Sequence, residues 1–186
     1  MSSSQQSPIR AAVLGYGLAG SVFHAPLIAS VEEMEVAVIV TANPERQARA
    51  QRDYPAARVL STADALFADP TAIDLVVVAT PNDSHLALGM AAIQAGLPVV
   101  IDKPFTSTSA DARQLIEAAT AANVPLTVFQ NRRWDSDFRT LQALLAAGGA
   151  GRDRALREPL RALSPNGECE CLARARGATG GGRATL

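Results

Sequence analysis

A glycine-rich turn near the amino terminus is the first stretch whose residue types and spacing predict chemistry. Gly15, Gly17 and Gly20 form a G-x-G-x-x-G pattern directly after an apolar run and directly before a predicted helix. In a dinucleotide-binding turn the first glycine permits a tight strand exit, the second lets the backbone approach a pyrophosphate, and the third lets helix and strand pack closely. The helix N–H groups and dipole would then hold the phosphates. The same pattern also serves as a sharp corner without a ligand.

A second group of polar residues follows a fully apolar run at 74–79. Thr80, Pro81, Asn82 and His85 lie there in sequence. Asn82 is a good helix N-cap residue, which explains it without function. His85 titrates near neutrality and is predicted to contact ribose, nicotinamide or substrate, with a satisfied core histidine as the equal alternative. The other histidine, His24, is predicted to be structural.

Asp102-Lys103-Pro104 leaves another apolar run, at 98–101. Desolvation there would lower the pKa of the lysine, or its charge would orient a carbonyl or alcohol group. The alternative is an ordinary solvated surface charge. A lysine at the end of a buried strand, followed by proline, favours function, and Lys103 is the candidate catalytic residue.

The type of cofactor is predicted from the end of the second strand. A free 2′-hydroxyl usually meets an acidic residue about 20 residues after the glycines. Here the strand ends at Thr41 without an acid, and Arg46 follows where it could face a 2′-phosphate. Glu45 is the alternative acid, and a solvated Arg46 is the alternative without function. NADP is predicted, and NAD stays open.

Short aliphatic runs alternate with helical segments, which predicts an α/β fold: a doubly wound parallel Rossmann sheet with helices on both faces. Ligands of such a sheet bind at the carboxyl ends of the strands, so the polar loops above should meet at one edge. Predicted strands cover 9–14, 35–41, 59–60, 74–79, 98–101 and 124–129; predicted helices cover 18–30 (irregular near Pro26), 44–53, 63–67, 84–95, 109–122 and 136–147.

Composition restricts the class of protein and its partners. The chain has 186 residues, 48% of them hydrophobic and 4% aromatic, and a formal net charge of −1. Nothing in that charge favours nucleic acid or an anionic membrane as a partner. Cys169 and Cys171 are too close for an ordinary disulfide and have no histidine nearby to complete a metal set, so no metal is predicted. Residues 1–8 lack a secretory signal and are predicted to be a disordered tail, so a cytoplasmic protein is expected.

Taken together, these motifs resemble the NAD(P)-dependent oxidoreductases grouped as glucose-fructose oxidoreductase, inositol dehydrogenase and MocA. Asp102 stands where the family pattern usually has Glu. The resemblance implies hydride transfer with a sugar, polyol or similar substrate, with Lys103 beside the nicotinamide, Asn82 and His85 on the cofactor, and Arg132 to Trp134 at the border of the active site. The segments that carry it are Gly15-Tyr16-Gly17-Leu18-Ala19-Gly20, Ala79-Thr80-Pro81-Asn82-Asp83-Ser84-His85, Ala95-Gly96, Asp102-Lys103-Pro104 and Asn131-Arg132-Arg133-Trp134.

The resemblance also implies a second domain, which supplies a His or Tyr acid/base and selects the substrate. No His or Tyr follows Arg133 in this chain. The dinucleotide-binding domain is predicted over 9–147. Residues 148–186, rich in Arg, Ala and Gly, are predicted to be an irregular tail, either out-of-frame or truncated sequence or a natural disordered segment. The chain is therefore expected to hold the nucleotide-binding half of an oxidoreductase. The alternatives are an inactive NAD(P)-binding module or remnant, and an interaction protein that kept only the fold. The oligomeric state is not predicted.

Overall fold

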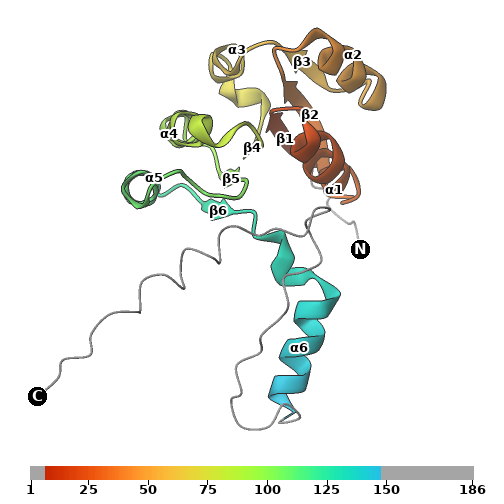
Figure 1. The fold of residues 1–186 in the computed structure, drawn as a ribbon. Helices are drawn as coiled ribbons and strands as arrows, with labels where there is room; N and C mark the ends of the chain where they lie inside the picture. The colour runs from red at the N-terminus through yellow and green to blue at the C-terminus, as the bar shows by residue number, and fades with distance from the viewer. Residues whose placement is uncertain (1–6, 148–186) are drawn as a thin grey trace, which may run out of the picture. The chain divides into compact units, whose positions relative to one another are not determined.

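A six-stranded parallel sheet organises the first part of the chain (Figure 1). The computed structural model describes residues 7–147, and the chain divides into two compact units between Asp135 and Ser136, ahead of the predicted domain end at 147. The strand order is β3-β2-β1-β4-β5-β6, which is the doubly wound order, so the predicted fold class is confirmed. The strands are β1 (Ile9–Leu14), β2 (Met34–Val40), β3 (Arg58–Leu60), β4 (Leu75–Val78), β5 (Val99–Ile101) and β6 (Leu126–Val128).

The carboxyl ends of the strands are level. Leu14, the last residue of β1, pairs with Val40 of β2 on one side and with Val78 of β4 on the other. Val78 pairs in turn with Ile101 of β5, and Ile101 with Val128 of β6. The loops that leave these strands therefore start from one line along the edge of the sheet.

Alternate side chains of β1 enter two separate cores. Ala12 and Leu14 face one core, while Ala11 and Val13 face the other. The first core is covered by α3, α4 and α5, and the second by α1 and α2, so helices cover both faces as predicted. The helical segments are η1 (Ala19–His24), α1 (Ala25–Ala29), α2 (Pro44–Asp53), α3 (Ala63–Phe67), η2 (Pro70–Ala72), η3 (Asn82–Ser84), α4 (His85–Gln94), α5 (Ser109–Ala122), η4 (Asn131–Trp134) and, in the second unit, α6 (Ser136–Ala146).

The helix after the glycine turn is irregular in the place that the sequence predicts. It begins as a π-helix, η1, and becomes the α-helix α1 only at Ala25. Pro26 has no N–H and lies in the first turn of α1, so the regular hydrogen-bond pattern is interrupted next to it. The π-turn buries His24 and Gly20 while leaving Phe23 on the surface.

The short helical turns η2, η3 and η4 were not predicted. The predicted helix over 84–95 is preceded by η3 and begins at His85, and the predicted strand over 124–129 shortens to β6. Gly96, at φ +72°, follows the end of α4, where a left-handed residue that ends a helix is commonly glycine. The predicted tail at 148–186, with its two cysteines, and residues 1–6 lie outside the described residues.

Tyr16 ties the glycine turn to α2. Its buried hydroxyl donates to Asp53 at 2.8 Å, and the Arg49 guanidinium lies 5.9 Å from its ring centre. Burial, together with the bond to Asp53, raises the pKa of Tyr16, so the hydroxyl keeps its proton and remains a donor.

We expect Tyr16→Phe to lower the free energy of unfolding by about 1 kcal/mol, because Asp53 loses its hydrogen-bond donor. Urea denaturation measures the change. Tyr54→Phe is the matched control, since the Tyr54 hydroxyl forms no hydrogen bond within residues 7–147. If both substitutions lowered the free energy of unfolding equally, the stabilising role of the hydrogen bond from Tyr16 to Asp53 would be contradicted.

Candidate nucleotide-binding site

The three glycines of the turn meet three different constraints. Gly15 has φ +96°, and a methyl group on it would lie 2.6 Å from the carbonyl oxygen of Ala79. A methyl group on Gly20 would overlap the carbonyl oxygen of Gly15. At Gly17 the nearest atom to such a methyl group is the Arg46 guanidinium, at 3.6 Å. Gly17 is thus the position of the turn where the backbone is open to an approaching group.

A first cavity of about 310 Å³ lies beside the turn, at the ends of β1, β2 and β4. It brings together five of the predicted site residues: Gly15, Thr41, Arg46, Thr80 and Pro81. Its remaining walls come from residues that the sequence analysis did not assign to the site: Leu14, Tyr16, Val40, Ala42, Ser61, Thr62, Ala63, Ser84 and Leu88.

Arg46 is held at the rim of this first cavity by the start of α2. Asn43 caps that helix, its side-chain oxygen accepting the Arg46 N–H at 3.0 Å. Gln47, in the same turn, donates to the carbonyl of the buried Thr41 at 2.7 Å. Within the described residues Arg46 forms no ion pair, and Glu45 does not line the cavity. A cation without an acidic partner therefore faces the cavity.

A second cavity, of about 570 Å³, lies on the other side of the turn, at the ends of β5 and β6. The predicted residues Leu18, Ala19, Asp102, Lys103 and Arg132 line it. Phe23, Phe129, Gln130, Asn131 and Asp135 complete the wall and were not predicted.

The exposed Lys103 begins a short turn at the wall of the second cavity. Its backbone N–H donates to the Asp102 carboxylate at 2.7 Å, and the peptide bond to Pro104 is cis. Arg132, the other cation of the wall, pairs with Asp135 at 2.9 Å. Within residues 7–147 the Lys103 ammonium has no such carboxylate partner. It is the free cation of this part of the wall.

His85 is a buried histidine that joins two loops. Its Nε2 lies 2.9 Å from the carbonyl oxygen of Thr80, while its Nδ1 lies 3.0 Å from that of Pro104 and 3.3 Å from that of Phe105. The side chain is 1% exposed. Both ring nitrogens face protein carbonyls, as the alternative of a core histidine requires, while a cofactor contact by His85 stays a prediction.

Besides His85, four predicted residues lie outside both cavities: Gly17, which lies in the turn between them, Gly20, Asn82 and Trp134. Gly20 is buried under the turn, whereas Asn82 and Trp134 are exposed on the surface. Asn82 is not a helix cap, because η3 carries no side-chain capping bond and α4 starts at His85. A cofactor contact by Asn82 or Trp134 stays a prediction.

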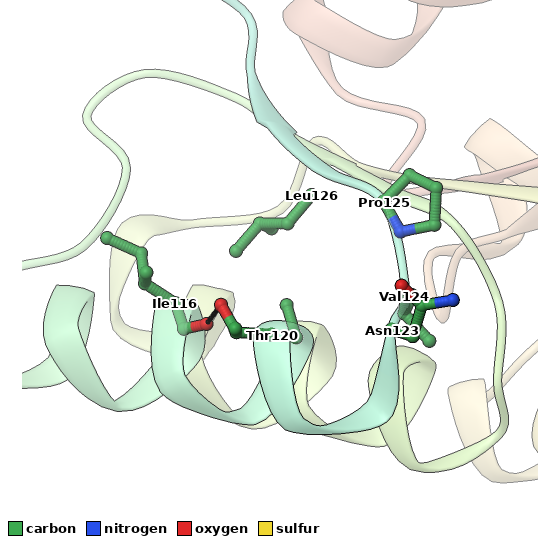
Figure 2. A pocket seen from close by; sticks show the side chains of 7 residues that line it. Ile116, Thr120, Asn123, Val124, Pro125 and Leu126 are labelled. Atoms are coloured by element: carbon green, nitrogen blue, oxygen red, sulfur yellow. Dashed lines mark hydrogen bonds between the residues drawn. The ribbon is translucent and has the colours of Figure 1, made fainter.

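Another hollow, of about 400 Å³, lies between the end of α5 and the start of β6 (Figure 2). Its side chains include none that ionises, and the hydrogen bond drawn there, from the Thr120 hydroxyl to the Ile116 carbonyl at 2.7 Å, is internal to the helix. Nothing in this hollow equips it for chemistry.

Residues 7–147 also gather no group of three or more His, Cys, Asp or Glu side chains fit for a metal ion. None of their helices combines the length and the apolar character that crossing a bilayer needs.

Comparison with known proteins identifies the family of this chain. Residues 9–130 match the Gfo/Idh/MocA family, described as an oxidoreductase family with an NAD-binding Rossmann fold. The chain belongs to this family. The match covers the glycine turn, both histidines and Lys103, and the resemblance seen in the sequence is confirmed.

Several members of the family are closely similar to this chain. The oxidoreductase YdgJ of Escherichia coli K12 is 48% identical over 143 residues, covering 77% of this chain and 40% of YdgJ. The scyllo-inositol 2-dehydrogenase (NADP+) IolW of Bacillus subtilis is 43% identical over 140 residues, and the match covers 75% of this chain and 38% of IolW. An Agrobacterium radiobacter oxidoreductase solved with NAD+, L-tartaric acid and magnesium is 29% identical, with a TM-score of 0.71. The match covers 76% of this chain and 41% of that oxidoreductase. The chain thus spans about 40% of the length of these relatives, and what it matches is their nucleotide-binding part.

The glycines of the turn allow affinity to be separated from stability. We expect Gly20→Ala to lower the free energy of unfolding by about 1–3 kcal/mol, because the added methyl group meets the backbone of Gly15. Gly17→Ala should fold with nearly wild-type stability and bind nicotinamide dinucleotides more weakly. Chemical denaturation and calorimetric titration measure the two effects. This division would be contradicted if Gly17→Ala were much less stable than the wild type, or if it bound the dinucleotides as tightly as the wild type does.

We expect His85→Leu to lower the free energy of unfolding by about 1–3 kcal/mol, since three buried carbonyl contacts to the ring are lost while the volume is largely kept. Asn82→Ala, on the exposed turn before it, is the control and should leave stability unchanged. Thermal or urea unfolding of both variants tests the role. A His85→Leu variant as stable as the wild type would contradict this structural role.

Proposed function

We propose that this chain supplies the cofactor-binding half of an NADP-dependent oxidoreductase, one that transfers hydride between the nicotinamide and a hydroxyl or carbonyl carbon of a sugar, polyol or similar small molecule. The observation that carries the proposal is the pair of cavities on either side of the glycine turn, with Arg46 on one and Lys103 on the other. A dinucleotide has two ends joined by a pyrophosphate, and this arrangement offers a place for each.

The residues present fit such a cofactor. Gly17 leaves open the room that a side chain would fill, and the turn is followed at once by the first helix, whose N–H groups are suited to phosphate. Thr41 and Arg46 would hold the adenosine ribose end in the first cavity. Leu18 and Ala19, on the far side of the turn, would border the nicotinamide end in the second cavity.

NADP is proposed over NAD because of the charges around the first cavity. Arg46 faces it without an acidic partner among the described residues, and Glu45, the alternative acid, is not part of its wall. A guanidinium suits a phosphate group better than a neutral ribose hydroxyl. The Bacillus subtilis relative IolW is named as an NADP+ enzyme, which supports the choice, whereas the Agrobacterium radiobacter relative was solved with NAD+.

Lys103 is proposed to bind the reacting oxygen of the substrate. Nicotinamide supplies the hydride chemistry when bound, and the protein supplies binding and orientation. The Lys103 ammonium would donate a hydrogen bond to the carbonyl or hydroxyl oxygen and stabilise negative charge that develops on it. Arg132, held by Asp135, would border the same space. The acid/base that moves the substrate proton is not assigned within this chain.

A cofactor-binding module without turnover is the second candidate. It is favoured by one observation: both histidines, His24 and His85, are buried, so neither is open to a substrate. In that case the chain would bind the dinucleotide, and a polyol panel would give no activity. The cytoplasmic location and a substrate of the sugar or polyol class stay predictions.

Calorimetric titration with NADPH and NADH tests the proposal. We expect NADPH to bind more tightly than NADH. Arg46→Ala should weaken NADPH binding about tenfold or more, as the loss of a charge-assisted contact would, and should leave NADH binding nearly unchanged. Arg52→Ala removes the same charge from the last turn of the same helix, away from the cavity, and should change neither.

Two results would overturn these assignments. If neither nucleotide binds, both cofactor-dependent functions fail, and an interaction protein with this fold remains. If NADH binds at least as tightly as NADPH, or if Arg46→Ala and Arg52→Ala behave alike, the assignment of Arg46 to a 2′-phosphate is wrong.

A further inference from the structure

His24, the second histidine, is buried in η1 beneath the second cavity. Its ring is 4% exposed, and its face lies on Phe129, with ring centres 4.3 Å apart. Its Nε2 is a buried nitrogen without a hydrogen-bond partner in the part of the chain that the structure describes. A buried polar atom of this kind is uncommon and calls for an explanation.

The unpartnered nitrogen faces Asp102. His24 Nε2 lies 3.6 Å from Asp102 Oδ2, just beyond hydrogen-bond distance. The other carboxylate oxygen, Oδ1, accepts the backbone N–H of Lys103 at 2.7 Å. Asp102 thus lies between the buried ring and the lysine, and its side chain is only 13% exposed.

Two opposing effects act on the His24 ring. Burial lowers its pKa and is the larger effect, while the charge of Asp102 and its contact with the ring raise it. Phe129, on the ring face, has no charge. The other charged groups around the cavity above are Lys103, Arg132 and Asp135, the last two paired with each other. The ring is therefore neutral at pH 7 and takes up a proton in more acidic solution, where Asp102 becomes its ion-pair partner.

We propose that His24 is a positioning residue for Lys103: on protonation its Nε2–H closes onto Asp102 Oδ2, and the carboxylate, held at both oxygens, moves the Lys103 backbone. Acidification would then change how Lys103 is presented to the cavity. This inference rests on the proposed function, which gives Lys103 its role in substrate binding. The movement of the turn itself does not depend on any nucleotide.

Nuclear magnetic resonance of the free chain tests the coupling. The chain has only two histidines, so the His24 ring signals are assigned by comparing the wild type with His24→Gln. We expect the Lys103 amide signal to shift with pH at the same midpoint as the His24 ring. In Asp102→Asn the His24 midpoint should move to lower pH, and the Lys103 amide should no longer follow it.

A pair of substitutions at His24 separates positioning from simple packing. Gln places an amide donor near the Nε2 position at every pH, whereas Leu fills space without a donor. We expect the Lys103 amide of His24→Gln to resemble that of the acidic wild type, and that of His24→Leu to resemble the neutral one. Asp135→Asn, on the same cavity wall but paired with Arg132, is the control and should leave both titrations unchanged.

The inference is overturned if the Lys103 amide titrates with an unchanged midpoint in His24→Leu, or if Asp102→Asn leaves the His24 midpoint unaltered. If His24→Leu does not fold, the Asp102→Asn and His24→Gln comparisons decide alone. None of these measurements includes a nucleotide. If they show no coupling between His24 and Lys103, the proposed cofactor site is unaffected. If instead NADPH does not bind, the same measurements still test the coupling.

Discussion

Both cavities depend on the close approach of the first helix to β1, where the Gly15 carbonyl occupies the space that a side chain at Gly20 would need. That approach sets the start of η1 directly over the end of the strand. The turn that results is a shared wall, with Gly15 and Tyr16 on the first cavity and Leu18 and Ala19 on the second. If the helix moved outward, neither cavity would keep its shape. The placement of both cavities therefore depends on the close packing of Gly20 against the carbonyl oxygen of Gly15.

The level ends of the strands extend this constraint to the later loops. Because Leu14, Val78 and Ile101 end in register, the loops after β4 and β5 leave the sheet side by side. His85 then links them through the carbonyls of Thr80 and Pro104. The residues before and after this link line different cavities, Thr80 the first and Lys103 the second. A buried histidine thus joins the two loops that contribute to the walls of the two cavities.

The sequence predicts the sheet, both helical faces and the location of the site, because apolar runs and the glycine turn are local signals. It predicts the irregular first helix for the same reason, since Pro26 removes a donor wherever it lies in a helix. It does not distinguish a buried His85 from a cofactor-facing one, as that depends on carbonyls about twenty residues away in the chain. Ser61, Phe23 and Phe129 were missed because ordinary residues become cavity walls only through the topology. His24 was predicted to be structural, and its burial agrees, but the sequence holds no signal that Asp102 lies next to it.

The orientation of Asp102 bears on what Lys103 can do. An aspartate next to a lysine in sequence could pair with the ammonium, and such a pair would offset the charge that a substrate oxygen needs. Within the described residues it does not: one oxygen accepts the Lys103 peptide N–H and the other faces His24. The carboxylate is thus directed into the protein, and the ammonium is left to the cavity. A longer side chain at this position, such as the glutamate of the usual family pattern, has one more methylene with which to cross the 3.6 Å gap to the ring. With aspartate at this position the structure leaves the gap at 3.6 Å, which is the distance that the proposed protonation would close.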